Sequence, residues 1–135
     1  MNTFQDTLAL AGRILLASLF VLSGYNKIIG FDGTVGYIAA GGLPLPAVVA
    51  VLTITLELVG GLMLVVGLLT RPVALAIAAF TLLAAFLFHA YWSVSDAARM
   101  GQYLSFWKNM SIAGGMLVLA AFGPGTISLD ARRRA

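Results

Sequence analysis

The chain has 135 residues, of which 61% are hydrophobic and only 10% are charged, and it carries a net charge of +3. An ordinary soluble domain has roughly 45–50% apolar and about 25% charged residues, and a chain of this size cannot hide such an excess of apolar surface in one core. The composition therefore excludes most soluble folds and predicts a single domain, residues 1–135, embedded in lipid. The absence of cysteine excludes disulfides, thiol redox motifs and cysteine-held metal clusters.

Four apolar segments follow one another along the chain. A helix needs roughly 20 apolar residues to cross the hydrocarbon core of a bilayer. On this basis we predict helices over residues 8–28, 47–69, 73–91 and 108–122. The segments do not alternate apolar and polar residues as β-barrel strands do. The predicted fold is an all-α membrane protein, a bundle of four transmembrane helices with short loops.

The segments between these helices are predicted to be short links. In the first, residues 30–46, Asp32 is expected to cap a short helix over residues 33–40 that lies on the outer membrane surface with Phe31, Val35 and Ile38 towards lipid. Arg71-Pro72 predicts a tight hairpin between the second and third helices. Residues 92–107 are predicted to be a polar and aromatic link.

The distribution of basic residues predicts the orientation in the membrane. An even number of spans places both termini on one side, and that side carries Arg71 and the run Arg132 to Arg134. The positive-inside bias then puts both termini in the cytoplasm, and Arg13 is expected to contact headgroups there. Without a basic face or an aromatic platform, the arginine run does not predict nucleic-acid binding. The bilayer is the expected partner.

Polar residues inside the predicted spans indicate a candidate site. Glu57 falls near the middle of the second span, where a carboxylate has to be protonated, paired or hydrated. Further polar side chains lie in the outer halves of the other three helices. If these faces point to the bundle axis, they line an outward-opening pocket with Glu57 as its floor. The predicted ligand-binding residues are Ser23, Lys27, Glu57, His89, Lys108 and Asn109.

Simpler interpretations of the same residues remain open. Lys27 and Lys108 could each extend to the outer headgroups, and His89 could be a packing histidine near a helix end. One histidine without cysteine does not make a usual zinc or cluster site, so no metal site is predicted. No phosphate loop, dinucleotide fingerprint or nucleophile elbow is present, and no catalytic residue is assigned.

Several motifs, taken together in their order and spacing along the chain, resemble the DoxX family of bacterial membrane proteins. They are Ser23-Gly24-Tyr25-Asn26-Lys27, Phe31-Asp32-Gly33-Thr34-Val35, Glu57, Gly67-Leu68-Leu69-Thr70-Arg71-Pro72, His89-Ala90-Tyr91-Trp92, Phe106-Trp107-Lys108-Asn109 and Gly123-Pro124-Gly125-Thr126-Ile127-Ser128-Leu129-Asp130. The resemblance implies a four-helix protein of the bacterial inner membrane. The family is named for a subunit of a thiosulfate:quinone oxidoreductase, and other members are associated with membrane redox assemblies.

Three functions are compatible with this sequence. The first is a redox-associated subunit that binds a quinone or a similar small molecule, with Glu57 handling protons and the tail of the ligand among the outer aromatic residues. Because no redox centre is encoded, a partner protein or a bound cofactor would have to supply electrons, so whether the chain is itself an enzyme stays open. The second is a small-solute or proton-coupled permease, which would need a homo-oligomer. The third is a non-catalytic assembly or scaffold subunit.

Overall fold

The computed structural model describes residues 2–133, which form helices and connecting turns with no strand among them. Helix α1 (Thr3–Ile29) is followed by the short α2 (Phe31–Ala40). A continuous helical rod then runs through α3 (Pro46–Thr55), the π-helical turn η1 (Leu56–Gly60) and α4 (Gly61–Val66). The remaining elements are α5 (Thr70–Phe88), the 3-10 turn η2 (Tyr91–Ser93), α6 (Asp96–Phe122) and α7 (Leu129–Arg132).

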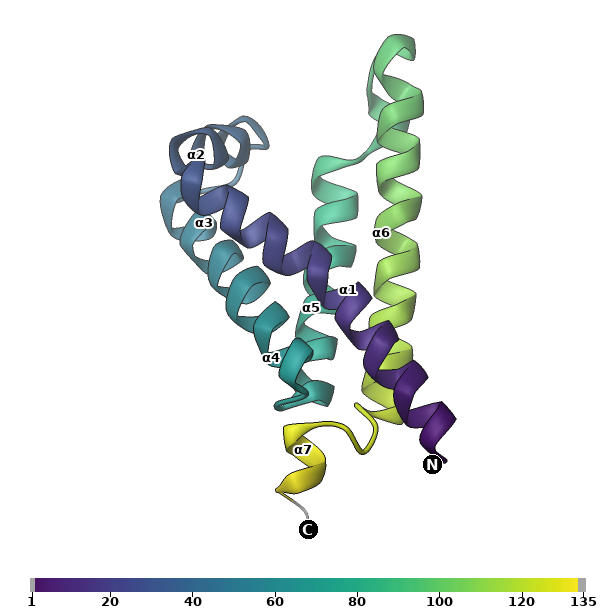
Figure 1. The fold of residues 1–135 in the computed structure, drawn as a ribbon. Helices are drawn as coiled ribbons and strands as arrows, with labels where there is room; N and C mark the ends of the chain where they lie inside the picture. The colour runs from purple at the N-terminus through teal and green to yellow at the C-terminus, as the bar shows by residue number, and fades with distance from the viewer. Residues whose placement is uncertain (1, 134–135) are drawn as a thin grey trace.

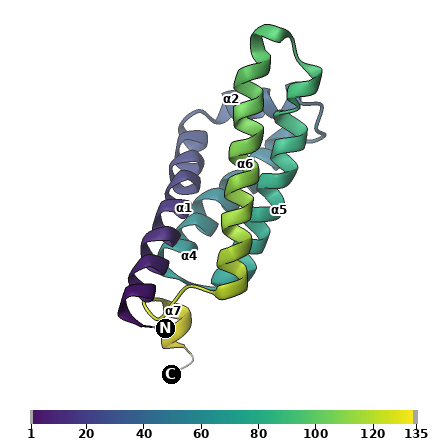
Figure 2. The same cartoon turned by 90° about the vertical axis from the view of Figure 1, so that its right-hand side faces the viewer.

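The helices form two arms that meet at one end of the molecule and diverge towards the other (Figure 1). One arm is the hairpin of α5 and α6, which lie side by side (Figure 2). The other arm contains α1 packed against η1 and α4, with α2 next to α3 at its far end. The start of α1 and the whole of α7 are located at the end where the arms meet.

Three helical stretches are long and apolar enough to cross a membrane: Thr3–Ile29, Pro46–Val66 and Thr70–Ser93. Helix α6 has 27 residues, but Lys108 and Asn109 interrupt its apolar run. By length and composition, therefore, the described residues contain three candidate spans, and the predicted four-helix count is not established. The all-helical class is confirmed.

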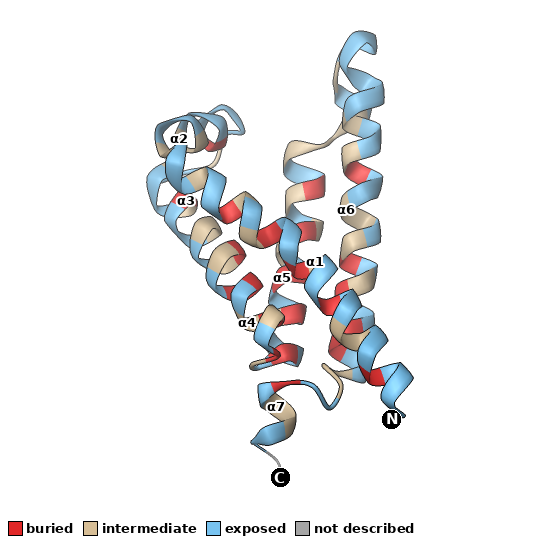
Figure 3. Cartoon of the chain, in the orientation of Figure 1, coloured by how far each residue is buried: buried red, intermediate tan, exposed pale blue. Residues whose placement is uncertain are grey.

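The core where the arms meet combines large apolar side chains, among them Leu64, Ile77 and Met116, with alanines. Ala17, Ala74 and Ala78 are almost fully buried there and allow the helix backbones to approach closely. Large apolar side chains cover the outside instead, among them Leu15, with 73% of its surface exposed, and Phe122, with 80%. Buried positions accordingly lie on the faces that the helices turn to one another (Figure 3). Such an exterior is suited to lipid.

The C-terminal segment 123–133 folds back under the bundle and holds its lower end together. Arg13 is only 2% exposed, and its guanidinium donates hydrogen bonds to the carbonyls of Val65 (3.2 Å), Pro124 (2.6 Å) and Ile127 (2.9 Å). The expectation that Arg13 contacts headgroups is therefore wrong, because the returning segment surrounds it with carbonyl acceptors. A second contact joins this segment to α1: the carboxylate of Asp6 accepts a hydrogen bond from the Thr126 N–H at 2.9 Å.

A third contact of the C-terminal segment caps the start of α5. The two carboxylate oxygens of Asp130 accept hydrogen bonds from the N–H groups of Leu69 and Thr70, both at 2.8 Å. These N–H groups have no partner in their own helix because they lie at its first turn. Gly67, in a left-handed conformation (φ 70°), leaves room for this segment, since a Cβ there would lie 2.5 Å from the Cβ of Ser128.

Three details of the predicted links are wrong. Helix α6 begins at Asp96, so most of the predicted link 92–107 is helical; polar residues continue the helix beyond its apolar part, and an acidic residue favours its first turn. The predicted short helix exists as α2, but Gly30 is its N-cap and Asp32 forms no cap. Ile38 is buried rather than turned to lipid, with only 5% of its surface exposed.

Candidate functional site

A cavity of about 400 Å³ lies between the two arms, in the half of the molecule away from the chain ends. Its volume falls within the range of small-molecule sites in proteins, roughly 300–1,000 Å³. Residues of α1, α2, α3, η1, α5 and α6 line it. The lining includes all six residues singled out from the sequence: Ser23, Lys27, Glu57, His89, Lys108 and Asn109.

A close crossing of α1 over η1 positions the two charged residues at the centre of the site. A Cβ added to Gly24 would lie 2.8 Å from the backbone nitrogen of Leu58, so the helices touch through their backbones. A Cβ added to Gly61 would lie 2.8 Å from the Cγ2 of Val21. Lys27 follows Gly24 by about one turn, and Glu57 immediately precedes Leu58. The crossing therefore brings their side chains together.

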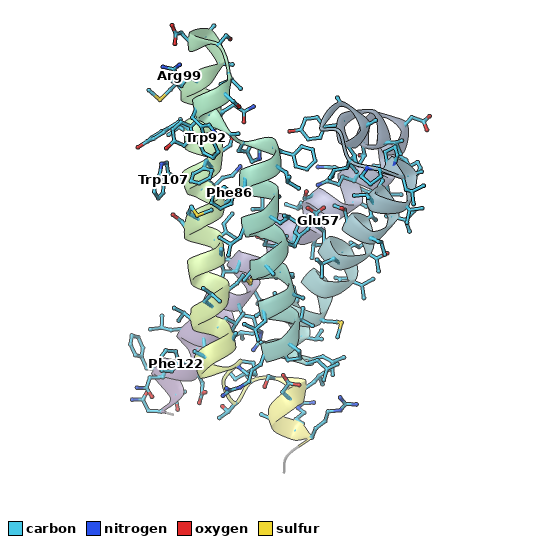
Figure 4. The ribbon with its side chains drawn as sticks, turned by 180° about the vertical axis from the view of Figure 1, so that it is seen from behind. Glu57, Phe86, Trp92, Arg99, Trp107 and Phe122 are labelled. Carbon is cyan, nitrogen blue, oxygen red and sulfur yellow. The ribbon has the colours of Figure 1, made fainter. Side chains whose placement is uncertain are left out.

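Glu57 belongs to the π-helical turn η1 and is 5% exposed. Its side chain lies between the two arms (Figure 4). Single π-helical turns within α-helices occur frequently at functional sites, where they change the direction in which a side chain points. The local distortion of the helix thus coincides with the one acidic residue of the cavity lining.

Lys27 forms a direct ion pair with Glu57. Its Nζ lies 2.8 Å from Oε2 and 3.1 Å from Oε1 of the carboxylate, and it also donates to the hydroxyl of Ser23. The sequence left open whether Glu57 is protonated, paired or hydrated, and in the structure it is paired with Lys27. The oblique course of α1 brings the two groups into contact (Figure 1). The pairing compensates for much of the cost of burying the carboxylate.

The polar residues on the α5 and α6 arm are arranged differently. The Nδ1 of His89 lies 2.8 Å from Gln102 Oε1, so this histidine links the end of α5 to α6. Lys108 is exposed and Asn109 half-buried. Among residues 2–133 neither side chain has a hydrogen-bond partner or an ion-pair partner. Both can therefore donate to a molecule in the cavity.

Helix α2 covers the cavity at the far end of the arms. Tyr37 of α2 stacks on Phe88 of α5, with ring centroids 5.2 Å apart and planes inclined by 22°. Gly41, which follows α2, allows this contact, since a Cβ there would lie 2.6 Å from Phe88 Cε1. Ile38 and Leu43 also line the cavity. Helix α2 thus connects the two arms above the polar residues.

Sequence reasoning missed part of the lining. Thr81, 3% exposed, lies in the middle of α5 and contributes a hydroxyl to the cavity. The signal was its place on the small-residue face of α5 that leads to His89. Most of the remaining lining is apolar, with Phe20, Leu56 and Phe80 among its residues.

The outer aromatic residues form a separate cluster outside the cavity. Phe106 makes edge-to-face contacts with Phe86, at 5.3 Å between ring centroids, and with Trp92, at 5.5 Å. Phe86, Trp92 and Trp107 gather on the α5–α6 arm, away from Glu57 (Figure 4). None of these aromatic residues lines the cavity. The tail of a bound molecule would therefore contact the apolar cavity walls, contrary to the expectation that it lies among these rings.

Within residues 2–133 no three potential metal ligands of the types His, Asp and Glu come together. The site accordingly consists of one ion pair, several free hydrogen-bonding groups and apolar walls. Such an arrangement can bind and orient a small organic molecule and exchange protons with it.

Comparison with known proteins gives matches over most of the chain. The model of the DoxX family matches residues 8–90. The inner membrane protein YphA of Escherichia coli (strain K12) is 42% identical over 128 residues, which cover 95% of this chain and 91% of that protein. The inner membrane protein YqjF of the same organism is 45% identical over 130 residues, covering 96% and 95%. The Surfeit locus protein 4 homolog of Drosophila melanogaster is 24% identical over 138 residues, only 43% of its length. No solved structure matches the chain.

Proposed function

We propose that this chain, which belongs to the DoxX family, is an inner-membrane protein that binds one small molecule with a polar head and an apolar body in the cavity between its arms. Quinones are the class of molecule that fits this description best. Their head groups carry carbonyl oxygens that accept hydrogen bonds, and their bodies are apolar.

The observation that carries the proposal is the gathering of polar residues from distant parts of the chain around one cavity. Ser23 and Lys27 come from α1, Glu57 from η1, and Lys108 and Asn109 from α6. In a scaffold subunit these residues would be expected to point separately to headgroups or to neighbouring helices. Their convergence in a largely apolar space favours ligand binding.

The chemistry of the lining supports a role in holding the head group and handling protons. Asn109 and Lys108 offer unpaired donors to a carbonyl, while Lys27 is held in place by Glu57. Reduction of a quinone to a quinol takes up two electrons and two protons. In this proposal a membrane redox partner protein supplies both electrons, and Glu57 takes up protons from water, one at a time, and passes them to the head group.

The proposal includes α6 as a fourth membrane span, with both chain ends in the cytoplasm. Helix α6 has 27 residues, about 40 Å at 1.5 Å per residue, and lies alongside α5. Four crossings would place both chain ends on one side of the membrane, and the start of α1 and α7 do lie at the same end of the molecule (Figure 1). Arg71, Arg132 and Arg133 belong to that end, which supports a cytoplasmic location by the positive-inside bias. Arg134 lies outside the described residues.

Purification in lipid nanodiscs tests the ligand-binding function. Mass spectrometry of the extracted lipids should detect a quinone in a fixed ratio to the protein. Ala84 lines the cavity, so Ala84→Phe should fill it and abolish co-purification. Ala79 is exposed on the same helix and outside the cavity, so Ala79→Phe is the matched control and should retain the quinone. Absence of quinone from the wild type, together with no binding of added decyl-benzoquinone, would contradict the proposal.

A further inference from the structure

Thr81 is the buried polar residue of the cavity that has no internal partner. It is 3% exposed, and its Oγ1 makes no hydrogen bond with any residue of the described chain, 2–133. Leaving a buried hydroxyl without a hydrogen bond costs free energy, so a native protein normally supplies a partner. The partner of Thr81 must come from the cavity that it lines.

Three other threonines in the helices of this chain form hydrogen bonds within their own helix. The hydroxyls of Thr7, Thr34 and Thr55 each donate to the carbonyl four residues earlier, at 2.8, 3.1 and 2.8 Å. This back-bonding is the usual arrangement for a threonine within a helix. Thr81 lies within α5 and lacks such a bond. Its hydroxyl is therefore available to the cavity.

The two other buried polar atoms without a partner in residues 2–133 are Arg13 Nε and Thr70 Oγ1. Neither residue lines the cavity. Arg13 is already held by three carbonyls through its other nitrogens. Thr81 alone among the three combines burial, a free hydroxyl and a position in the site.

The charges around the buried part of the cavity already balance. Its buried lining residues are Phe20, Ile38, Glu57 and Thr81. Glu57 is the one ionisable residue among them, and Lys27 neutralises it at 2.8 Å. A carboxylate beside Thr81 would have to break this ion pair or pair with Lys108, the other cation of the lining, which is exposed and therefore gives a water-screened ion pair too weak to offset the cost of burying the charge. An uncharged head group meets neither penalty.

We propose that Thr81 contacts the ligand directly, an inference that rests on the proposed function. Its hydroxyl forms a hydrogen bond with an uncharged polar head group, either a carbonyl or a hydroxyl. Thr81 thereby selects neutral amphiphiles over carboxylates with a tail of the same length. The ion pair of Lys27 and Glu57 stays intact when such a molecule binds.

The test compares Thr81→Val, which keeps the shape of the side chain without the hydroxyl, with Thr81→Ser, which keeps the hydroxyl. Binding of decyl-benzoquinone and of decanoate is measured in nanodiscs. Thr81→Val should bind the quinone about 5- to 10-fold more weakly, the usual effect of losing one hydrogen bond, and Thr81→Ser should bind within about twofold of the wild type. Thr55→Val is the control and should leave binding unchanged, because Thr55 is exposed and outside the cavity.

Two further readouts separate contact with the ligand from a structural role. The ligand-free Thr81→Val protein should melt at the same or a higher temperature, since the variant removes an unpaired buried hydroxyl. The carbonyl stretching band of the bound quinone should move to higher wavenumber in Thr81→Val. If Thr81→Val does not assemble, Thr81→Ala takes its place in both measurements.

The outcomes distinguish the inference from the function on which it rests. If the wild type binds neither probe, the proposed function fails. If the wild type binds the quinone and Thr81→Val binds it equally well with an unchanged carbonyl band, only the assignment of Thr81 is overturned. Tighter binding of decanoate than of the quinone would overturn the selection of a neutral head.

Discussion

The ammonium group of Lys27 lies 2.8 Å from a carboxylate oxygen of Glu57, across the point where α1 and η1 touch. The pair joins two helices that diverge from the other arm, and it forms the charged part of the cavity lining. Its side chains are 29% and 7% exposed, so water screens it only partly. The following predictions concern this pair and the contacts around it.

Removing one partner of the ion pair should destabilise the protein more than removing both. Glu57→Gln or Lys27→Met should each cost about 3 kcal/mol, at the low end for a buried pair because Lys27 is partly exposed. The double variant Lys27→Met with Glu57→Gln should recover most of this loss. Thermal unfolding in detergent measures all three. The control is Asp96→Asn, which removes the exposed pair of Asp96 and Arg99 and should change nothing measurable. Additive losses in the double variant would contradict the direct pairing.

Gly24 should not tolerate a side chain. A Cβ there would lie 2.8 Å from the Leu58 nitrogen and 2.9 Å from its Cβ, so Gly24→Ala should push α1 away from η1 and cost about 1–3 kcal/mol. Gly12→Ala in the same helix is the matched control, since its Cβ would have no atom within 4 Å. That variant should be neutral or slightly stabilising, because alanine favours helix. Equal melting temperatures for the two variants would show that the crossing is not tight.

Arg13 should be irreplaceable by lysine. Its two terminal nitrogens reach carbonyls of Val65, Pro124 and Ile127, and a single ammonium group cannot reproduce this fork. We expect Arg13→Lys to lower stability by about 2 kcal/mol and Arg13→Met by more, because the latter leaves three carbonyls without their donor. Unfolding in urea or mild SDS would measure the loss. Arg132→Met, at an exposed arginine, is the control and should have no effect.

The proposed topology predicts the behaviour of reporter fusions. Alkaline phosphatase fused after residue 133 should be inactive, and green fluorescent protein at the same place should fluoresce, because both would lie in the cytoplasm. Phosphatase inserted between Val94 and Ser95, ahead of α6, should be active. Active phosphatase at both positions would mean that α6 does not cross the membrane.

The sequence predicted the helices better than the connections between them. Apolar length alone located α1, the rod 46–66 and α5 to within a few residues at most boundaries. It placed the start of the last helix at residue 108 instead of Asp96, because the polar first half of α6 carries no hydropathy signal. Within that half, Phe106 packs against Phe86 and Trp92 of the aromatic cluster, a contact between distant residues that hydropathy does not report.

The polar residues of the site could be identified from the sequence because charged residues are rare within apolar segments. Glu57 and Lys27 stood out for this reason, and the structure brings them together at one cavity. Their use by a ligand remains a prediction. The environment of Arg13 was not visible, since its acceptors are 52, 111 and 114 residues away along the chain. The unpaired hydroxyl of Thr81 was hidden as well, because it depends on a side-chain rotation rather than on residue type.

The returning C-terminal segment has a consequence for biosynthesis. Arg13 finds two of its three carbonyl partners, and the N–H groups of Leu69 and Thr70 find theirs, in residues 124–130, which the ribosome makes after α6. A nascent chain that stops after α6 therefore carries a buried arginine and an uncapped helix within an otherwise complete bundle. Translation of residues 124–130 completes these contacts at the lower end of the bundle. Prematurely ended chains should consequently be recognisable to membrane proteases as unfinished.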